Sequence, residues 1–313
     1  MSQTQSPPPP EPKFVLRDGM GPVSCIAFGL DETLYAGTQD GWIHVWDLTI
    51  NRRKSSFQVG KSVCLAIGDF FTKLVVQVKG EGISVWNSSP KFALEHKFDY
   101  QYMGFCKFEC DKTLNYVFVP DDDGEIKIIN LRNFKLENKF ICPAVKLGEV
   151  MVMKYSHYCH QDVLLVGYES GDIYVWNVTQ CSHVGHFKIA NAPMAIDFDP
   201  DSGKGVCGTE SESVFLFKID KNFAFTVESS IMLKNPGVSA VTIRPDRKVV
   251  VLGCWDGNIR IYSWKSSKIL GVLTEHLETI NALCFSSKPI SMWNSIILAA
   301  GSKDKSISLW TFY

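Results

Sequence analysis

The 313-residue sequence lacks the features that mark several large classes of protein. No apolar run approaches the roughly 18 residues that a membrane-spanning helix needs, so no membrane segment is expected. Residues 1–12 contain neither a basic patch nor an apolar stretch, which argues against a secretory signal. The formal net charge is only −1, so the charge balance predicts neither a direct nucleic-acid partner nor an anionic membrane surface.

Motifs for cofactors and metals are incomplete. Gly60-Lys61-Ser62 spells the end of a phosphate-binding loop, but Ser55 stands where that motif needs its earlier glycine. Tyr155–His160 contains three side chains of metal-ligand type without the second cluster that a zinc site needs. Asp121–Glu125 resembles half a calcium loop and lacks the later ligands. We expect no cofactor and no metal, and we interpret the last two segments as a polar surface loop and an acidic hairpin turn.

The cysteines give no disulfide pattern. Six of the ten lie singly in apolar segments that we expect to be strands: Cys25, Cys64, Cys106, Cys207, Cys254 and Cys284. Scattered thiols of this kind are typical of buried free cysteines in a reducing compartment. We therefore expect a cytosolic or nuclear protein, in which the glycosylation sequons at Asn87 and Asn177 are incidental.

The sequence does contain a repeat, which begins at Val23. Each unit is an alternating strand, a turn, an apolar strand, a turn with Asp or Gly, and a strand that ends near a large apolar residue. These end markers are spaced 40 to 48 residues apart: Trp46, Trp86, Ile129, Trp176, Phe217, Tyr262 and Trp310. The spacing matches the period of about 40–45 residues of a four-stranded propeller blade. The sequence therefore predicts an all-β, seven-bladed propeller.

The ends of the repeat predict how the ring closes. Only Thr311–Tyr313 follow the last marker, too few residues for a fourth strand, whereas Phe14–Arg17 reads as a strand without a blade. We expect this N-terminal strand to become the outer strand of blade 7, because closure leaves only short, protected edges. Residues 13–313 then form the propeller, and residues 1–12 form a disordered proline-rich leader. A role of that leader as a ligand of a proline-binding domain stays open.

The last blade carries a polar set typical of WD40 repeats. His276 precedes the blade, Ser302 ends its second strand, Asp304 lies in the next turn and Trp310 ends the third strand. A His, a Ser and an Asp also suggest a hydrolase triad, but a nucleophile needs an oxyanion hole that faces a pocket. We therefore expect His276, Ser302, Asp304 and Trp310 to hold blade 7 together by hydrogen bonds, and we expect no catalytic residue.

Three segments carry a closer resemblance: Asn235–Lys248, Trp255–Ile261 and Ala300–Trp310. With the leader they resemble the guanine-nucleotide-binding-protein beta-subunit-like family, whose fungal relatives are the ASTRA-associated WD-repeat proteins. The resemblance implies a non-enzymatic scaffold or adaptor. It also implies association with the telomere-maintenance-type co-chaperone complex that matures phosphatidylinositol-3-kinase-related protein kinases. We expect protein partners and a monomeric propeller.

Other WD-repeat functions compete with this one. A heterotrimeric G-protein beta subunit needs an N-terminal helix of several heptads to bind its gamma subunit, and Pro7–Pro12 forbids such a helix. Many ubiquitin-ligase substrate receptors carry a Trp-Asp-x-Arg motif, but here Thr49 follows Trp46-Asp47-Leu48. A chromatin-associated reader and a ubiquitin-ligase substrate receptor remain the alternatives.

The turns between the second and third strands predict where a partner binds. Such turns face the narrow end of a propeller, and the residue before each turn's Asp should point outward. The residues at this place are Gln39, Glu169, Trp255 and Lys303. Trp255 is the leading candidate because exposed Trp side chains are common in interface hot spots. The alternative is that Trp255 packs flat on a neighbouring blade and serves only the fold.

Overall fold

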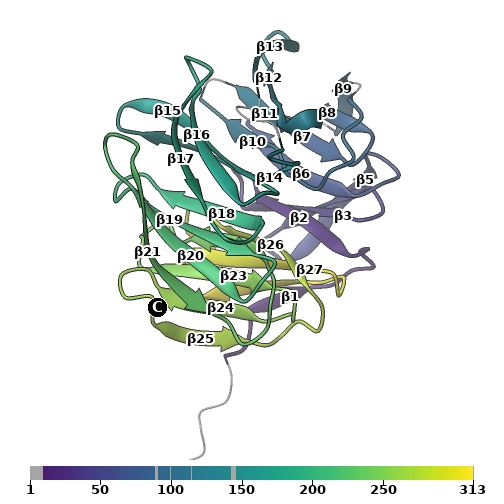
Figure 1. The fold of residues 1–313 in the computed structure, drawn as a ribbon. Coiled ribbons are helices and arrows are strands. Elements are labelled where there is room, and N and C mark those ends of the chain that lie inside the picture. The colour runs from purple at the N-terminus through teal and green to yellow at the C-terminus, as the bar shows by residue number, and fades with distance from the viewer. Residues whose placement is uncertain (1–9, 89–90, 99, 114, 142–145, 313) are drawn as a thin grey trace, which may run out of the picture.

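Seven antiparallel sheets of four strands each surround a central axis in a computed structural model of the chain (Figure 1). The structure describes residues 10–88, 91–98, 100–113, 115–141 and 146–312. One edge strand of each sheet lies towards the axis and the other lies at the periphery, so the sheets form the blades of a propeller. The prediction of an all-β, seven-bladed propeller is confirmed.

The first three blades take their strands in chain order from the axis outwards. Blade 1 contains β2 (Val23–Phe28), β3 (Thr33–Thr38), β4 (Trp42–Asp47) and β5 (Arg52–Gln58). Blade 2 contains β6 (Cys64–Phe70), β7 (Lys73–Val78), β8 (Gly82–Asn87) and β9 (Ala93–Phe98). Blade 3 contains β10 (Glu109–Asp111), β11 (Tyr116–Pro120), β12 (Ile126–Asn130) and β13 (Lys135–Phe140), with the short 3-10 helix η1 (Asp122–Gly124) in its acidic turn.

Blades 4 to 6 repeat the same order. Blade 4 contains β14 (Val150–Tyr158), β15 (Gln161–Tyr168), β16 (Asp172–Asn177) and β17 (Ser182–Lys188). Blade 5 contains β18 (Pro193–Asp199), β19 (Lys204–Thr209), β20 (Ser213–Ile219) and β21 (Phe225–Met232). Blade 6 contains β22 (Val238–Ile243), β23 (Val249–Cys254), β24 (Ile259–Ser263) and β25 (Ile269–Leu273).

Blade 7 closes the ring with strands from both ends of the chain. It contains β26 (Ile280–Phe285), β27 (Ile297–Ser302), β28 (Ile307–Thr311) and, as its outer strand, β1 (Phe14–Leu16). Strand β1 runs antiparallel to β28, and the Lys13 backbone N–H also donates to the Leu309 carbonyl at 2.7 Å. Leu16 is fully buried. The predicted closure by an N-terminal strand is confirmed, whereas most of the predicted leader, residues 1–9, lies outside the described residues.

The core lies between the blades, because neighbouring sheets pack face to face. Each repeat marker sits in a cluster of buried apolar residues that its blade shares with the preceding blade: Trp46, Trp86, Ile129, Trp176, Phe217, Tyr262 and Trp310. Second and third strands are therefore buried on both faces, as in β27, while outer strands such as β5 remain largely exposed. The regular spacing of the markers in the sequence therefore reflects the packing of each blade against the preceding blade.

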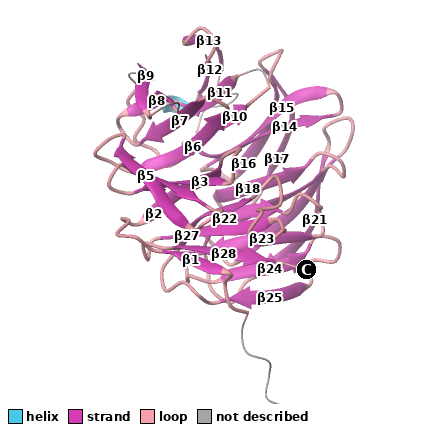
Figure 2. Ribbon diagram, turned by 180° about the vertical axis from the view of Figure 1, so that it is seen from behind, coloured by secondary structure: helices cyan, strands magenta, loops and turns pink. Residues whose placement is uncertain are grey.

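Strand is almost the only regular structure in the described part of the chain (Figure 2). No described helix is long and apolar enough to cross a membrane. The nine described cysteines are free, but Cys106 lies in an extended segment before β10 rather than in a strand, contrary to our expectation. Tyr155–Tyr158 belongs to β14, so only Cys159 and His160 form the turn that we expected to span the whole polar segment.

Candidate functional site

Blade 7 contains a chain of four hydrogen-bonding side chains, three of them buried. The Trp310 Nε1–H donates to Ser308 Oγ at 2.7 Å, and Ser308 Oγ lies 2.7 Å from His276 Nε2. His276 Nδ1 lies 2.8 Å from Asp304 Oδ2. Burial alone would raise the pKa of Asp304, but hydrogen bonds from His276 and Ser306 outweigh this effect and hold it at about 2. The set ties the loop before β26 to the turn before β28.

The serine in this chain is Ser308, whereas our sequence analysis named Ser302. Ser302 Oγ donates to the Glu278 carbonyl at 2.8 Å and accepts the Asp304 backbone N–H at 3.1 Å. The strand register explains the difference, because Ala300 of β27 stands opposite Ser308. Alanine leaves the space between Trp310 and His276 to the side chain of Ser308.

Ser308, His276 and Asp304 therefore have the order of a hydrolase triad. Ser308 is fully buried, and its Oγ already accepts the indole N–H of Trp310. A nucleophile needs access to a substrate carbonyl and an oxyanion hole beside it. The geometry supports a structural role for this set.

Blade 6 has an arginine, Arg260, at the place that Ser308 holds in blade 7, which sequence reasoning missed. Arg260 donates from Nη1 and Nη2 to the two carboxylate oxygens of Asp256 at 3.0 and 2.6 Å, and Asn235 Nδ2 donates to the same carboxylate at 2.8 Å. Burial opposes ionisation of Asp256, but these hydrogen bonds lower its pKa. The available sequence signal for this ion pair was the spacing of four residues between Asp256 and Arg260. The pair fixes the turn that carries Trp255.

The four predicted partner-binding residues occupy equivalent places at one end of the ring. We call this the upper end; it carries the turns between second and third strands, and the turns between first and second strands lie at the lower end. Each of the four donates its backbone N–H to a carbonyl just before its blade's first strand: Gln39 to Pro22, Glu169 to Glu149, Trp255 to Gly237 and Lys303 to Thr279, at 2.9 to 3.1 Å. Lys79 makes the same bond to Val63 and was not predicted.

Trp255 packs and is exposed at the same time. A Cβ added to Gly237 would lie 2.0 Å from the indole, so the ring lies directly over this glycine, whose φ is +91°. Only glycine combines this backbone conformation with such a close approach. Trp255 still has 41% of its surface exposed. It therefore packs on the loop of its own blade and remains accessible from the upper end.

An extended segment, residues 101–108, crosses the upper end from blade 2 to the axis. Buried and exposed residues alternate strictly along it, and Met103 and Phe105 are 66% and 68% exposed. The ammonium of Lys79 lies 3.2 Å from the centroid of the Phe105 ring, within cation–π range. Leu277, in the loop between blades 6 and 7, is 89% exposed. The upper end thus combines exposed apolar side chains with charges. The alternation of buried and exposed residues along 101–108 was the sequence signal for the exposed side chains of this segment.

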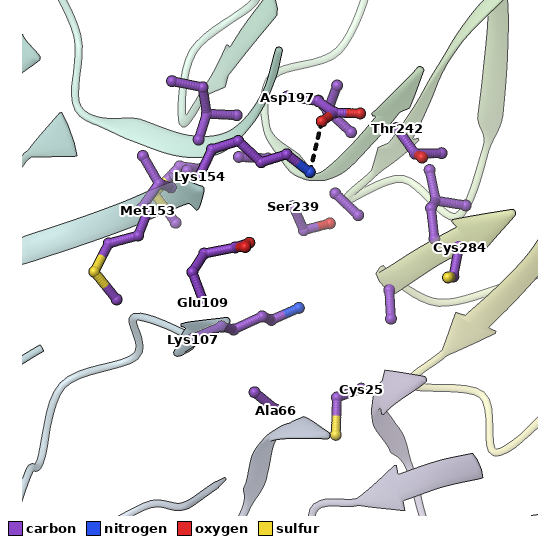
Figure 3. Close-up of a pocket in the computed structure, with 18 of the residues that line it drawn as sticks. Cys25, Ala66, Lys107, Glu109, Met153, Lys154, Asp197, Ser239, Thr242 and Cys284 are labelled. Carbon is purple, nitrogen blue, oxygen red and sulfur yellow. Dashed lines mark ion pairs between the residues drawn. The ribbon is translucent and has the colours of Figure 1, made fainter. Parts of the chain in front are cut away.

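The axis holds a cavity of about 340 Å³, lined by the innermost segment of all seven blades. Lys154 Nζ lies 2.8 Å from Asp197 Oδ1, and Lys107 and Glu109 reach into the same space (Figure 3). The Asp197 carboxylate raises the pKa of Lys154, whereas burial lowers the pKa of Lys107 and raises that of Glu109. Two cations and two carboxyl groups balance, so the channel is not a site for a highly charged ligand.

The segments weighed as cofactor or metal sites have local partners. His157 Nδ1 lies 2.8 Å from Asp162, and in the acidic turn Asp121 and Glu125 form ion pairs with Lys127 and Lys139. No three His, Cys, Asp or Glu side chains converge within the described ranges. Gly60-Lys61-Ser62 lies between β5 and β6 and is followed by a strand.

Comparison with known proteins matches both the repeat and the whole chain. The family model described as "WD domain, G-beta repeat" matches residues 11–47, 229–263 and 267–311. Guanine nucleotide-binding protein subunit beta-like protein 1 of Mus musculus is 26% identical, with 98% of each chain covered. ASTRA-associated protein 1 of Schizosaccharomyces pombe is 38% identical over 97% of this chain and 99% of its own, and that of Schizosaccharomyces japonicus is 26% identical over 97% and 99%. These matches support a WD-repeat adaptor. The chain belongs to the family of guanine nucleotide-binding protein subunit beta-like and ASTRA-associated WD-repeat proteins.

Proposed function

We propose that this protein is a non-catalytic adaptor that joins an assembly of the ASTRA kind. In this role it supports the co-chaperone complex that matures phosphatidylinositol-3-kinase-related protein kinases. The observation that carries the proposal is the end-to-end match to relatives named ASTRA-associated protein 1, which covers 97% of this chain at 38% identity in one of them. We further propose that it acts as a monomeric propeller in the cytosol, the nucleus or both.

The absence of catalysis is part of the proposal. The Ser-His-Asp arrangement that resembles a triad lies inside blade 7, with Ser308 fully buried. The axial cavity contains balanced charges, and its two closest opposite charges, Lys154 and Asp197, neutralise each other. An ion pair of this kind joins blades 4 and 5 and occupies the Asp197 carboxylate.

The partner-binding surface is proposed to be the upper end, around Trp255. Its ring offers apolar area at the end of the ring that also carries Lys303, Glu169 and Gln39, and Leu277 adds a nearly fully exposed apolar side chain. Hot spots combine a central aromatic anchor with a polar rim. The Asp256–Arg260 pair and Gly237 hold the Trp255 backbone and ring in place before a partner arrives, which lowers the ordering cost of binding.

Affinity purification tests both parts of the proposal. The tagged full chain, its Trp255→Ala variant and an Ile50→Ala variant as a matched exposed control at the lower end are expressed in cells depleted of the endogenous protein. Wild type and Ile50→Ala should recover the kinases and co-chaperones by quantitative mass spectrometry, whereas Trp255→Ala should lose roughly thirtyfold in affinity, as for a hot spot of about 2 kcal/mol.

Three results would contradict the proposal. Wild-type protein that recovers histones or ubiquitin-ligase subunits in place of the kinases would indicate another kind of adaptor. Kinase levels that stay constant after depletion would argue against a role in their maturation. A large drop in the melting temperature of Trp255→Ala would mean that Trp255 serves the fold, and the upper end would then lose its main candidate.

A further inference from the structure

The upper-end turns of blades 5, 6 and 7 are equivalent in register and different in charge. Each second strand ends its ladder with a glycine that pairs with the third strand: Gly208, Gly253 and Gly301. Two residues later the turns carry, in blade order, a glutamate, a tryptophan and a lysine: Glu210, Trp255 and Lys303. Two residues further on they carry a second glutamate, a glycine and a second lysine: Glu212, Gly257 and Lys305. Trp255 therefore lies between a turn with two carboxylates and a turn with two ammonium groups.

Backbone hydrogen bonds join these three turns. The Gly237 N–H donates to the Ser211 carbonyl of blade 5 at 3.0 Å, and the Trp255 N–H donates to the Gly237 carbonyl at 3.1 Å. On the other side, Thr279 Oγ1 donates to the Trp255 carbonyl at 3.2 Å, and the Lys303 N–H donates to the Thr279 carbonyl at 2.9 Å. The fold therefore fixes the order of charges across Trp255. We call the three turns, residues 210–213, 255–258 and 303–306, the charged platform.

The charges of the platform have little use inside the protein. Within the described residues, no basic side chain lies within 4.0 Å of the Glu210 or Glu212 carboxylate, and no acidic side chain lies within 4.0 Å of the Lys305 ammonium. Glu210 Oε2 is buried and finds no hydrogen-bond donor among these residues. Lys303 reaches only Glu278, at 3.9 Å, and both side chains are 54% exposed. A buried carboxylate oxygen without a donor costs free energy, which an incoming cation would offset.

Blade 2 shows charges at the same two positions that do serve the protein itself. They have opposite signs within one turn: Lys79 lies over the Phe105 ring at 3.2 Å, and Glu81 Oε1 accepts the Lys61 backbone N–H at 2.6 Å. Blades 5 and 7 instead place two like charges in one turn, where they repel each other. Complementary charges on a partner remove this repulsion, and they also fix the orientation in which the partner binds.

We propose that the charged platform binds an extended segment of a partner protein whose charges follow the complementary order. A basic residue lies over blade 5, an apolar side chain packs on Trp255 and an acidic residue lies over blade 7. Facing sheets are about 10 Å apart, so the turns of blades 5 and 7 are roughly 20 Å apart. An extended chain rises about 3.3 Å per residue, which separates the basic from the acidic residue by about six positions. This inference rests on the proposed function, because it takes the upper end as the partner surface and adds the chemistry of the partner.

The test uses three peptides that differ in the order or the sign of their charges, titrated into the ¹⁵N-labelled full chain by NMR. The ordered peptide is acetyl-Lys-Lys-Ser-Leu-Leu-Ser-Glu-Glu-amide, the mixed peptide is acetyl-Lys-Glu-Ser-Leu-Leu-Ser-Lys-Glu-amide, and the basic peptide is acetyl-Lys-Lys-Ser-Leu-Leu-Ser-Lys-Lys-amide. At low salt the ordered peptide should bind about fivefold more tightly than the mixed one, as expected for two exposed ion pairs. The ratio should approach one in about 1 M salt, which screens such pairs. Amide shifts should concentrate in the charged platform.

Charge reversal in blade 7 assigns the effect to the platform. The double variant Lys303→Glu, Lys305→Glu replaces two exposed lysines, and it should shift the preference from the ordered towards the basic peptide by about tenfold. The double variant Lys265→Glu, Lys268→Glu changes the net charge equally at exposed lysines between β24 and β25, and it should keep the wild-type ratio to within about twofold. Trp255→Ala should weaken all three peptides alike. Melting temperatures show whether each variant remains folded.

Three outcomes would overturn the proposal. Equal affinity of wild type for the ordered and mixed peptides would remove the role of charge order. An equal change of preference in the Lys265→Glu, Lys268→Glu control would show that only the net charge matters. A concentration-dependent dimer in light scattering that Lys303→Glu, Lys305→Glu abolishes would show that a second copy of this chain covers the platform.

The same variants separate this inference from the proposed function. If recovery of the kinases and co-chaperones in affinity purification depends on Trp255 but survives Lys303→Glu, Lys305→Glu, the function stands and the charge order is overturned. If the full chain distinguishes the ordered from the mixed peptide but recovers no kinases, the charge order stands and the function is overturned.

Discussion

Blade 7 and blade 3 have the same four-stranded topology and hold it in different ways. Blade 7 uses the chain of Trp310, Ser308, His276 and Asp304, all from its own repeat and the loop before it. Blade 3 has Ile129 at the place of Trp310, and its inner strand β10 is only three residues long. Its entry is held instead by Gln77 of blade 2, whose side-chain amide donates to the Cys106 carbonyl at 3.2 Å and accepts the Phe108 N–H at 2.8 Å.

The difference shows what a propeller blade requires. Buried backbone groups must find hydrogen-bond partners, and the side chain that satisfies them can come from the blade itself or from its neighbour. In blade 3 the polar set has drifted away, but packing of Ile129 against the preceding sheet and one buried glutamine keep the geometry. Four predictions separate these two ways of holding a blade, in order of expected effect.

Removal of the strand that completes blade 7 should have the largest effect. A chain without residues 1–18 loses the pairing of β1 with β28 and the burial of Leu16, at a cost of at least about 3 kcal/mol. A chain without residues 1–10 keeps both and should melt like the full chain. Thermal unfolding followed by circular dichroism compares the two, and equal melting temperatures would mean that blade 7 does not need β1.

Ser308→Ala should weaken blade 7 more than Ser302→Ala does. The first variant leaves the Trp310 indole N–H and His276 Nε2 without partners in a buried site, at about 2–4 kcal/mol. The second removes one partner each from the Glu278 carbonyl and the Asp304 N–H, at about 1–2 kcal/mol, because these bonds are only partly buried although Ser302 itself is fully buried. Denaturant unfolding gives both values. The reverse order would restore Ser302 as the serine of the set.

Gln77→Met should act on blade 3, although the residue belongs to blade 2. Methionine keeps the volume but leaves the Cys106 carbonyl and the Phe108 N–H unsatisfied, which should cost about 2–3 kcal/mol. Gln58→Met, at an exposed position of β5, is the control. Amide hydrogen exchange should accelerate at Phe108 and leave blade 7 unchanged. Uniform acceleration around the ring would mean that the blades do not open separately.

The smallest of the four effects should be a loss of stability of blade 7 in acid, through protonation of Asp304. The pKa of Asp304 is about 2, below its ordinary value of 3.8, so the folded state resists protonation more than the unfolded state. The stability from Asp304 is present above about pH 4 and is lost as the pH falls towards 2. Subtraction of an Asp304→Asn titration isolates this contribution, because Asn keeps a hydrogen-bond acceptor for His276. A pH-independent difference between the two proteins would contradict the assignment.

The sequence predicted the ring because its period and its unmatched strand are local patterns. The marker spacing gave seven blades, and Phe14–Arg17 had no other sheet to join. The choice between Ser302 and Ser308 was beyond reach, because it depends on the register that sets Ala300 opposite Ser308. The support from Gln77 was also hidden, since it joins residues about thirty positions apart in different repeats. The exposed Trp255 was expected, but its packing on Gly237 needed the loop geometry.

Closure by β1 also sets the order of events during synthesis. Strand β1 leaves the ribosome before every other strand of the propeller, and its partner β28 is made almost three hundred residues later. At translation rates of about 5–20 residues per second, β1 waits roughly 15–60 s with an unpaired edge. Every other blade can complete itself as it emerges, but blade 7 cannot. A chain that stops before β28 therefore remains an open array of sheets, and the pairing of β1 with β28 reports that the whole propeller has been synthesised.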